Sequence, residues 1–317
     1  MTSGHHRTAP ILLDVDTGVD DALAIAFAVR AGAYLVGVST VAGNVPVDLA
    51  TENTRRVLAM VRAESVPVHR GASRPLAIPH SDAVHVHGDN GLGGANLDES
   101  RAPESNINAI NAILDAGDRH AGDLVIVALG PLTNIAIALS LRPELASQVG
   151  RLVIMGGAFF VPGNVTPHAE FNIFTDPHAA EQVFAAPWAD LVAVGLDVTH
   201  QTVFSREQWE RIDDRASGNA GLVRRVTARS FLERRMDAVY LHDPLAVAVA
   251  LDPSIVTVQE HSVGVETSGE LRGKTMVAGG NAARIATNVD VGVFEGRFVE
   301  QLELPGRRSE IQPSRSE

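Results

Sequence analysis

Four aspartates lie within eight residues near the start of the chain, at Asp14, Asp16, Asp20 and Asp21, directly after the apolar run that begins at residue 11. Neighbouring carboxylates repel one another unless a cation lies among them. A helix cap could account for Asp20 or Asp21, but not for all four at the end of a buried strand. Because Mg²⁺ and Ca²⁺ bind carboxylate oxygens, the cluster predicts a site for a hard divalent cation.

Histidines provide the second group of candidate site residues. His242 precedes Asp243 and Pro244 at a predicted helix start, so we interpret it as a site residue and not as a core histidine. His85 and His87 form a His-Val-His segment, but two alternating histidines in a loop usually do not bind metal. Zinc fits the chain less well than a hard cation, because the sequence has no cysteine and no His-Glu-x-x-His motif.

The overall composition excludes several classes of function. The 317 residues contain 26 Lys and Arg against 38 Asp and Glu, a formal net charge of −12, which argues against binding to nucleic acid. The lack of cysteine excludes disulfides and thiolate catalysis. No apolar run approaches the roughly 18 residues of a membrane span, and the chain start lacks an apolar secretory core. We therefore expect a soluble, cytoplasmic protein with neither a nucleic acid nor a membrane as partner.

Short apolar runs alternate with longer amphipathic segments through the first two-thirds of the chain. Strands are predicted at 11–15, 35–40, 66–69, 123–129, 152–155 and 191–194, and helices at 20–30, 49–61, 107–114 and 177–186. We expect Asp48 to cap the second helix and Pro131 to lie in the first turn of the helix after strand 123–129. The alternation is typical of an α/β fold, Rossmann-like, with a mainly parallel sheet covered by helices on both faces. Ligands of such sheets bind at the carboxyl ends of the strands, where the aspartates lie.

A single catalytic domain is predicted over residues 11–304, after a flexible N-terminus at 1–10 and before a disordered tail at 305–317. Two segments break the alternation of strands and helices. Residues 71–104 are rich in Gly, His, Asp and Asn, and a loop of that length is usually functional. Residues 205–236 are predicted to be helical, with eight arginines on a solvated face.

Phosphatases of the haloacid dehalogenase type also have an aspartate pair after their first strand, and the first of the two aspartates is the nucleophile. Those enzymes need a lysine to stabilise the phosphoryl group, whereas the one lysine of this chain, Lys274, lies near its end. Gly269 is one position too close to Lys274 for a P-loop, and no Gly-x-Gly-x-x-Gly motif occurs. An aspartate-dependent phosphatase is therefore the weaker alternative.

A series of motifs between residues 11 and 304 resembles, in the same order, those of the inosine–uridine-type nucleoside hydrolases, which are Ca²⁺-dependent N-ribohydrolases. These motifs are Asp-x-Asp-x-Gly-x-Asp-Asp at 14–21, Ala-Gly-Asn at 42–44, Gly-Pro-Leu-Thr-Asn at 130–134, Met-Gly-Gly at 155–157, Gly-Asn at 163–164, Ala-Glu-Phe-Asn at 169–172 and Leu-His-Asp-Pro at 241–244. The first motif and the Glu-Phe-Asn and His-Asp-Pro segments are specific. The resemblance implies hydrolysis of ribonucleosides to free base and ribose, in nucleoside salvage.

The resemblance also implies which residues bind the metal and carry out the reaction. One Ca²⁺ per subunit would be held by Asp16, Asp21 and Asp243, together with the backbone carbonyl of Leu129. Asp16 would take a proton from the metal-bound water, and His242 would protonate the departing base.

A second set of residues would bind the nucleoside. The residues implied to contact the ribose or to complete the polar shell around it are Asp20, Asn44, Met155, Asn164, Glu170, Asn172 and Asp243. His87 would lie in a mobile loop on the side of the base. Because the metal would chelate the 2′,3′-diol, we expect 2′-deoxynucleosides to be poor substrates.

The chain departs from the family pattern at two places and leaves the base preference open. Thr17 stands where many relatives have proline, and Ala278–Gly280 occupy a stretch where relatives commonly have an aspartate. The base-binding side is not recognisable, so purine and pyrimidine nucleosides both remain candidates. The resemblance implies a homodimer or homotetramer. A protein that binds nucleosides with Ca²⁺ but has lost turnover is the other alternative.

Overall fold

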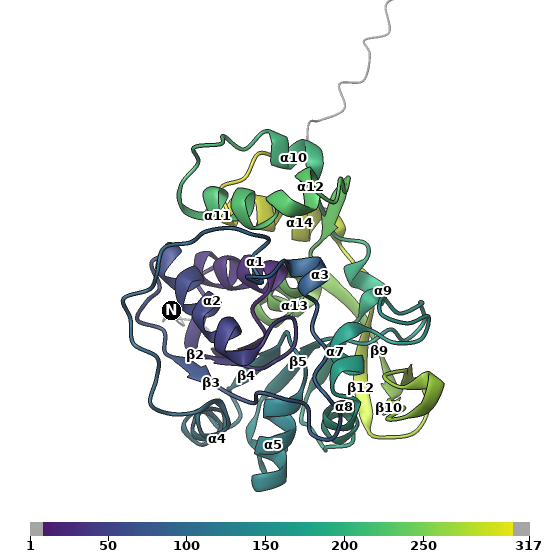
Figure 1. The fold of residues 1–317 in the computed structure, drawn as a ribbon. Coiled ribbons are helices and arrows are strands. Elements are labelled where there is room, and N and C mark those ends of the chain that lie inside the picture. Colours follow the sequence, from purple (N-terminus) through teal and green to yellow (C-terminus); the bar gives the residue numbers. More distant parts are fainter. Residues whose placement is uncertain (1–8, 307–317) are drawn as a thin grey trace, which may run out of the picture.

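An eight-stranded sheet forms the centre of the computed structural model, which describes residues 9–306 (Figure 1). The strand order is β3-β2-β1-β4-β5-β6-β12-β9, and every neighbouring pair is parallel except β12 and β9. The strands are β1 (Pro10–Val15), β2 (Tyr34–Thr40), β3 (Val68–Arg70), β4 (Val125–Ala128), β5 (Arg151–Met155), β6 (Leu191–Val194), β9 (Val256–Ser262) and β12 (Ala282–Val289). The predicted single-domain α/β fold with a mainly parallel sheet is confirmed.

The order of the strands explains where a ligand can bind. From β1 the chain builds outward through β2 and β3, and it then returns to the other side of β1 to add β4, β5 and β6. The carboxyl ends of β1 and β4 therefore flank the point at which the strand order reverses, which is the place where open α/β sheets bind ligands. The aspartate cluster follows β1 directly, and Leu129 follows β4.

Alternating side chains of the strands feed two hydrophobic clusters, one on each face of the sheet. In β1, Leu13 and Val15 belong to one cluster and Leu12 to the other. Helices that contribute to the first cluster are α1 (Val19–Arg30), α2 (Val47–Met60), α11 (Gly218–Val226), α13 (His242–Leu251) and α14 (Val291–Gln301). Helices that contribute to the second are α4 (Ala109–Arg119), α5 (Thr133–Leu141) and α8 (Pro177–Phe184). Helices thus cover both faces, as the sequence predicts.

The remaining elements are short. The helices are α3 (Val84–His87), α6 (Leu145–Gln148), α7 (Phe171–Thr175), α9 (Leu196–Thr199), α10 (Arg206–Glu210) and α12 (Ala228–Leu232), with 3₁₀ turns η1 (Pro253–Ile255) and η2 (Gly269–Leu271). Two antiparallel pairs stand apart from the main sheet: β7 (Val203–Ser205) with β8 (Ala238–Tyr240), and β10 (Gly264–Val265) with β11 (Thr275–Met276).

Three local predictions need correction. Pro46, and not Asp48, occupies the N-cap of α2, so Asp48 lies inside the first turn. Helix α5 begins at Thr133, two residues after Pro131, because Leu132 takes the N-cap position. The arginine-rich segment forms three short helices, α10, α11 and α12, in place of continuous helix (Figure 1).

Part of the arginine-rich segment is structural and not simply solvated. The guanidinium of Arg224 lies 4.0 Å from the ring centre of Trp209, and it also donates to the Trp209 carbonyl at 2.7 Å. Arg206 donates to the carbonyls of Phe231 and Met236 at 2.6 and 2.8 Å. These arginines therefore satisfy backbone carbonyls between the short helices.

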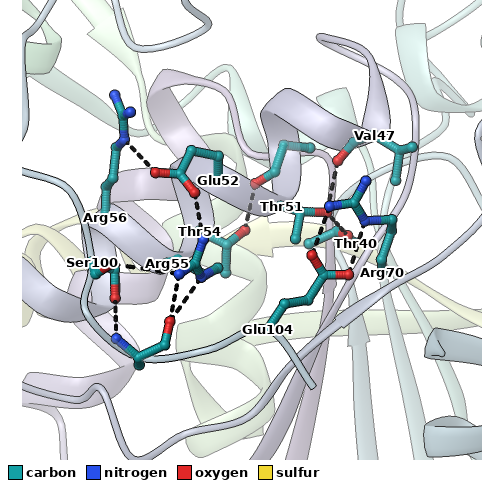
Figure 2. A network of polar contacts seen from close by, with 12 residues as sticks. Thr40, Val47, Thr51, Glu52, Thr54, Arg55, Arg56, Arg70, Ser100 and Glu104 are labelled. Atoms are coloured by element: carbon teal, nitrogen blue, oxygen red, sulfur yellow. Dashed lines mark hydrogen bonds and ion pairs between the residues drawn. The ribbon is translucent and has the colours of Figure 1, made fainter. Parts of the chain in front are cut away.

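The long loop before α4 is fastened to helix α2 by the polar network of Figure 2. Arg55 donates to the Ala102 carbonyl at 3.1 Å and to Glu52 at 2.6 Å. Arg70, at the end of β3, pairs with Glu104 at 2.6 and 2.9 Å. These contacts fix the loop across the end of the sheet, although the loop contains only one short helix, α3.

Strand β1 begins at Pro10, one residue before the predicted domain boundary. The predicted flexible start and disordered tail fall almost wholly on residues 1–8 and 307–317, which lie outside the described residues. Within residues 9–306, no helix has the length and apolar character needed to cross a membrane.

Candidate functional site

Three carboxylates converge beyond the carboxyl end of β1. Asp20 and Asp21 stand in the first turn of α1, and Asp243 stands in the first turn of α13. One oxygen from each of the three lies within 4.8 Å of the other two. Asp21 accepts hydrogen bonds from the backbone N–H of Gly18 at 2.9 Å and of Asp16 at 3.2 Å, which fixes its orientation. This group of oxygens is able to hold a metal ion.

The electrostatics of the cluster favour a cation. Burial and the neighbouring charge of Asp21 together raise the pKa of Asp20 to about 7. Burial and the charge of Asp20 likewise raise the pKa of Asp243 well above its usual value. Among the described residues, no Lys or Arg forms an ion pair with any of the three. Because a nearby cation favours ionised carboxylates, a divalent ion would relieve this repulsion.

Asp16 lies beside this group but outside it. Its Oδ2 accepts from the backbone N–H of Asn44 at 2.7 Å, and its Oδ1 accepts from the Asn44 side chain at 3.0 Å. The same Asn44 amide reaches Asp21 at 3.1 Å, so it links the two carboxylates. Burial and the charge of Asp21 raise the pKa of Asp16 well above its usual value. A Cβ at Gly43 would lie 2.0 Å from Oδ2 of Asp16, so only glycine fits there.

Asp14 is buried beneath the site and supports it. Its Oδ1 accepts from Ser39 at 2.5 Å and from the Asn134 side chain at 2.8 Å, whereas its Oδ2 has no partner. Asn134 also donates to the Thr40 carbonyl and accepts from the Ala72 N–H, so it joins the ends of β1 and β2 to the following loop. Burial raises the pKa of Asp14 to about 6.

Asn172 and Glu170 form a further wall of the site. The Asn172 amide donates to the carbonyls of Leu129 at 2.7 Å and Met155 at 3.0 Å, which ties the ends of β4 and β5 together. Glu170 is the N-cap of α7 and accepts from the backbone N–H groups of Gly157 and Asn172. Asn164 accepts from the N–H of Phe171 at 3.0 Å.

Two histidines face the site from other elements. His242 Nδ1 lies 2.8 Å from the hydroxyl of Thr199, and burial followed by the charges of His200 and His87 lowers its pKa to about 3. His87 Nδ1 accepts from the backbone N–H of Val19 at 3.0 Å, so a neutral His87 carries its proton on Nε2. Burial, then the charge of Arg234, lowers the pKa of His87 to about 4.

A cavity of about 350 Å³ brings nearly all the predicted site residues together. Those that line it are Asp20, Asn44, His87, Leu129, Met155, Asn164, Glu170, Asn172, His242 and Asp243. Asp16 and Asp21 are fully buried next to it and contact Asn44. The volume suits a small organic ligand.

Several cavity residues were missed by the sequence reasoning. They are His200, Arg234 and Tyr240, which also line the cavity, and Thr199, which contacts His242. His85, which the sequence analysis set aside as a metal ligand, lines the cavity as well. His200 and Thr199 follow β6, so the rule that polar residues after parallel strands face the ligand could have identified them. Nothing in the local sequence marks Arg234 or Tyr240.

Comparison with known proteins gives a consistent result. A family model described as inosine-uridine preferring nucleoside hydrolase matches residues 11–296. The pyrimidine-specific ribonucleoside hydrolase RihA of Escherichia coli is 39% identical over 297 residues, covering 89% of this chain and 94% of the relative. Probable uridine nucleosidase 2 of Arabidopsis thaliana is 34% identical, covering 84% and 85%. The solved purine-preferring ribonucleoside hydrolase from Gardnerella vaginalis matches with a TM-score of 0.87 at 31% identity, covering 92% of this chain and 98% of that one.

Proposed function

Since the chain belongs to the inosine-uridine preferring nucleoside hydrolase family and is a ribonucleoside hydrolase, we propose that it releases base and ribose with one Ca²⁺ bound per subunit. The observation that carries the proposal is the convergence of Asp20, Asp21 and Asp243 beside the cavity. When bound, a divalent cation supplies a water molecule of lowered pKa and a positive charge that orders the ribose hydroxyls. The oxygen-only donor set favours Ca²⁺ or Mg²⁺ over softer metals.

The family resemblance assigns the cation to Asp16, Asp21, Asp243 and the carbonyl of Leu129. Asp16 lies outside the group of three carboxylates but is linked to Asp21 through the Asn44 amide, whereas Asp20 is left for the ribose. The Leu129 carbonyl accepts one hydrogen bond from Asn172, which leaves it a second lone pair. Removal of the cation leaves adjacent buried carboxylates whose pKa values are raised, so metal binding releases protons.

Asp16 is the proposed general base that takes a proton from the attacking water. Asn44 holds both of its oxygens with hydrogen bonds, so the orientation of the carboxylate is fixed before the substrate arrives. The charge of a bound cation would favour the ionised carboxylate, which is the form of Asp16 that can accept a proton.

The ribose is proposed to lie between α1 and the wall formed by Asn172 and Glu170. Asp20, Asp243 and Asn172 would hold the 2′- and 3′-hydroxyls, whereas Asn164 and Glu170 would face the 5′-hydroxyl and Met155 would line the pocket. Negative groups around the sugar favour the positive charge that develops there as the glycosidic bond breaks. Because the 2′-hydroxyl has partners on this wall, 2′-deoxynucleosides should react poorly.

His242 is proposed to protonate the departing base, with His87 contacting the base from α3. His242 lines the same cavity as Asn172 and Glu170 and lies next to Tyr240, with the two ring centres 5.5 Å apart. Its Nδ1 is engaged by Thr199, so Nε2 is the ring nitrogen that remains for the base.

Ribose release from inosine, adenosine, guanosine, uridine and cytidine tests the proposal, first with Ca²⁺ and then with excess chelator. We expect chelator-sensitive release, with uridine and cytidine ahead, because RihA at 39% identity is named pyrimidine-specific. Asp16→Asn should abolish release from every nucleoside. Release that survives complete metal removal would contradict the role of the cation.

The same assay separates the two alternatives. Ca²⁺ binding without release from any nucleoside would indicate a binder that has lost turnover, whereas phosphate release from sugar phosphates would indicate the aspartate-dependent phosphatase. His242→Ala should lower turnover of natural nucleosides but spare p-nitrophenyl riboside, whose leaving group needs no proton. Equal losses on both substrates would contradict the general-acid role.

The cellular context is proposed from the same resemblance. We infer nucleoside salvage in the cytoplasm and assembly as a homodimer or homotetramer. Light scattering of the purified chain would measure the number of subunits directly, and a monomer would contradict the proposed assembly.

A further inference from the structure

We propose that Thr199 is a positioning residue that sets the orientation of the His242 ring. The inference rests on the proposed role of His242 as the proton donor to the leaving base. It adds a residue outside the motifs of the sequence, contributed by the short helix α9 at the end of β6.

The contact is specific and buried. The Thr199 hydroxyl lies 2.8 Å from His242 Nδ1, and the Thr199 side chain is fully buried. Helix α9 is itself held in place, because the N–H of Leu196 donates to the Gly157 carbonyl at 2.9 Å. The hydroxyl therefore approaches His242 from a fixed part of the sheet edge.

A hydroxyl is well suited to this position because it both donates and accepts hydrogen bonds. It can donate to Nδ1 or accept from Nδ1–H. When the protonated ring gives its Nε2 proton to the departing base, the remaining proton stays on Nδ1 and the hydroxyl accepts from it, so the contact persists through the transfer. Throughout, the contact at Nδ1 keeps Nε2 turned toward the cavity.

Ring packing restricts His242 further but does not fix which ring nitrogen faces the cavity. The ring centres of His200 and Tyr240 lie 5.7 and 5.5 Å from that of His242, and they limit how far the imidazole can swing. These rings make no hydrogen bond with Nδ1. Thr199 is thus the partner that determines which nitrogen faces the substrate.

Thr199→Val tests the inference, because valine keeps the shape of threonine and removes only the hydroxyl. We expect kcat/KM for uridine or inosine to fall about tenfold to a hundredfold, within the range that general acid catalysis supplies. Turnover of p-nitrophenyl riboside should stay within about twofold, since its leaving group needs no proton. Thr199→Ser, which restores a hydroxyl, should recover most of the loss on nucleosides.

Thr202→Val is the matched control. Thr202 is equally buried, and its hydroxyl donates to the Thr199 carbonyl at 3.2 Å and not to His242. We expect this variant to retain wild-type turnover of both substrates. Equal losses on both substrates in Thr199→Val, or no recovery in Thr199→Ser, would overturn the inference and indicate a purely structural hydroxyl.

His242→Ala, measured in parallel, distinguishes failure of the inference from failure of the proposed function. If His242→Ala separates the two substrates and Thr199→Val does not, the positioning role of Thr199 is wrong and the acid role of His242 stands. If His242→Ala fails to separate them, the proposed acid role is wrong and the inference falls with it.

Discussion

The buried carboxyl of Asp14 gives the metal-free protein a pH dependence that can be calculated and removed by one substitution. Its pKa in the folded protein is about 6, against an ordinary value of 3.8, because burial disfavours the charged form. A carboxyl whose pKa is raised by folding stabilises the fold while it is protonated. That stabilisation is complete below the unfolded pKa and is lost as the pH rises through about 6.

Asp14→Asn replaces the ionisable carboxyl by a neutral group of the same shape. Between about pH 4.5 and pH 8, a shift of this size changes the free energy of unfolding by about 2 kcal/mol. We therefore expect the free energy of unfolding of Asp14→Asn to rise by about 2 kcal/mol relative to that of the wild type as the pH is raised over this interval. Any effect of the substitution on stability that does not depend on pH cancels when the free energies at the two pH values are subtracted.

Urea unfolding of the chelator-treated protein at the two pH values measures this difference. Ser39→Ala provides a variant with the opposite effect, because Ser39 donates to Asp14 Oδ1 and favours its ionised form. That variant should show a steeper loss of stability with rising pH than the wild type. A difference between Asp14→Asn and wild type that does not change with pH would refute the reasoning.

Three further predictions concern the site itself. Ca²⁺ should raise the melting temperature of the metal-free protein more at about pH 8 than at about pH 5, because protons compete with the cation for the buried carboxylates. At a Ca²⁺ concentration a hundredfold above Kd, the expected stabilisation is about 2.7 kcal/mol. An equal rise at both pH values in differential scanning fluorimetry would argue against carboxylate ligands. Gly43→Ala should lower kcat by about a hundredfold, since its Cβ would lie 2.0 Å from Asp16 Oδ2; Gly296→Ala, whose Cβ meets nothing within 4 Å, should retain wild-type kcat. Within residues 9–306, Arg234 is the one Lys or Arg that lines the cavity. Arg234→Gln should lower kcat/KM about tenfold for nucleosides and for p-nitrophenyl riboside alike, because both leaving groups gain negative charge. Arg235→Gln changes the next residue, which does not line the cavity, and should leave kcat/KM for both substrates unchanged in steady-state assays.

The parts of the fold that the sequence predicts well are those determined by local patterns. The run 11–15 and the helix after it lie within one residue of their predicted bounds, because an apolar run and the following amphipathic period depend on neighbouring residues alone. Helix starts were less predictable. Asp48 has the right type for a cap, yet Pro46 takes that position because the chain turns earlier as it leaves β2.

The candidate site divides in the same way. The sequence by itself determined the aspartate cluster at 14–21. Carboxylates separated by so few residues must also lie close together in space at the end of a strand. It also determined the family, through motifs whose order along the chain requires no knowledge of the fold.

Only the tertiary structure decided which distant groups touch. Thr199 and His242 are 43 positions apart, and Val19 and His87 are 68 apart, so no local pattern links either pair. Their contacts exist because the strand order brings the ends of β1 and β6 and the start of α13 to one edge of the sheet. Burial at that edge then sets the pKa values of the carboxylates and histidines, since desolvation depends on everything that surrounds a group and not on its neighbours in sequence.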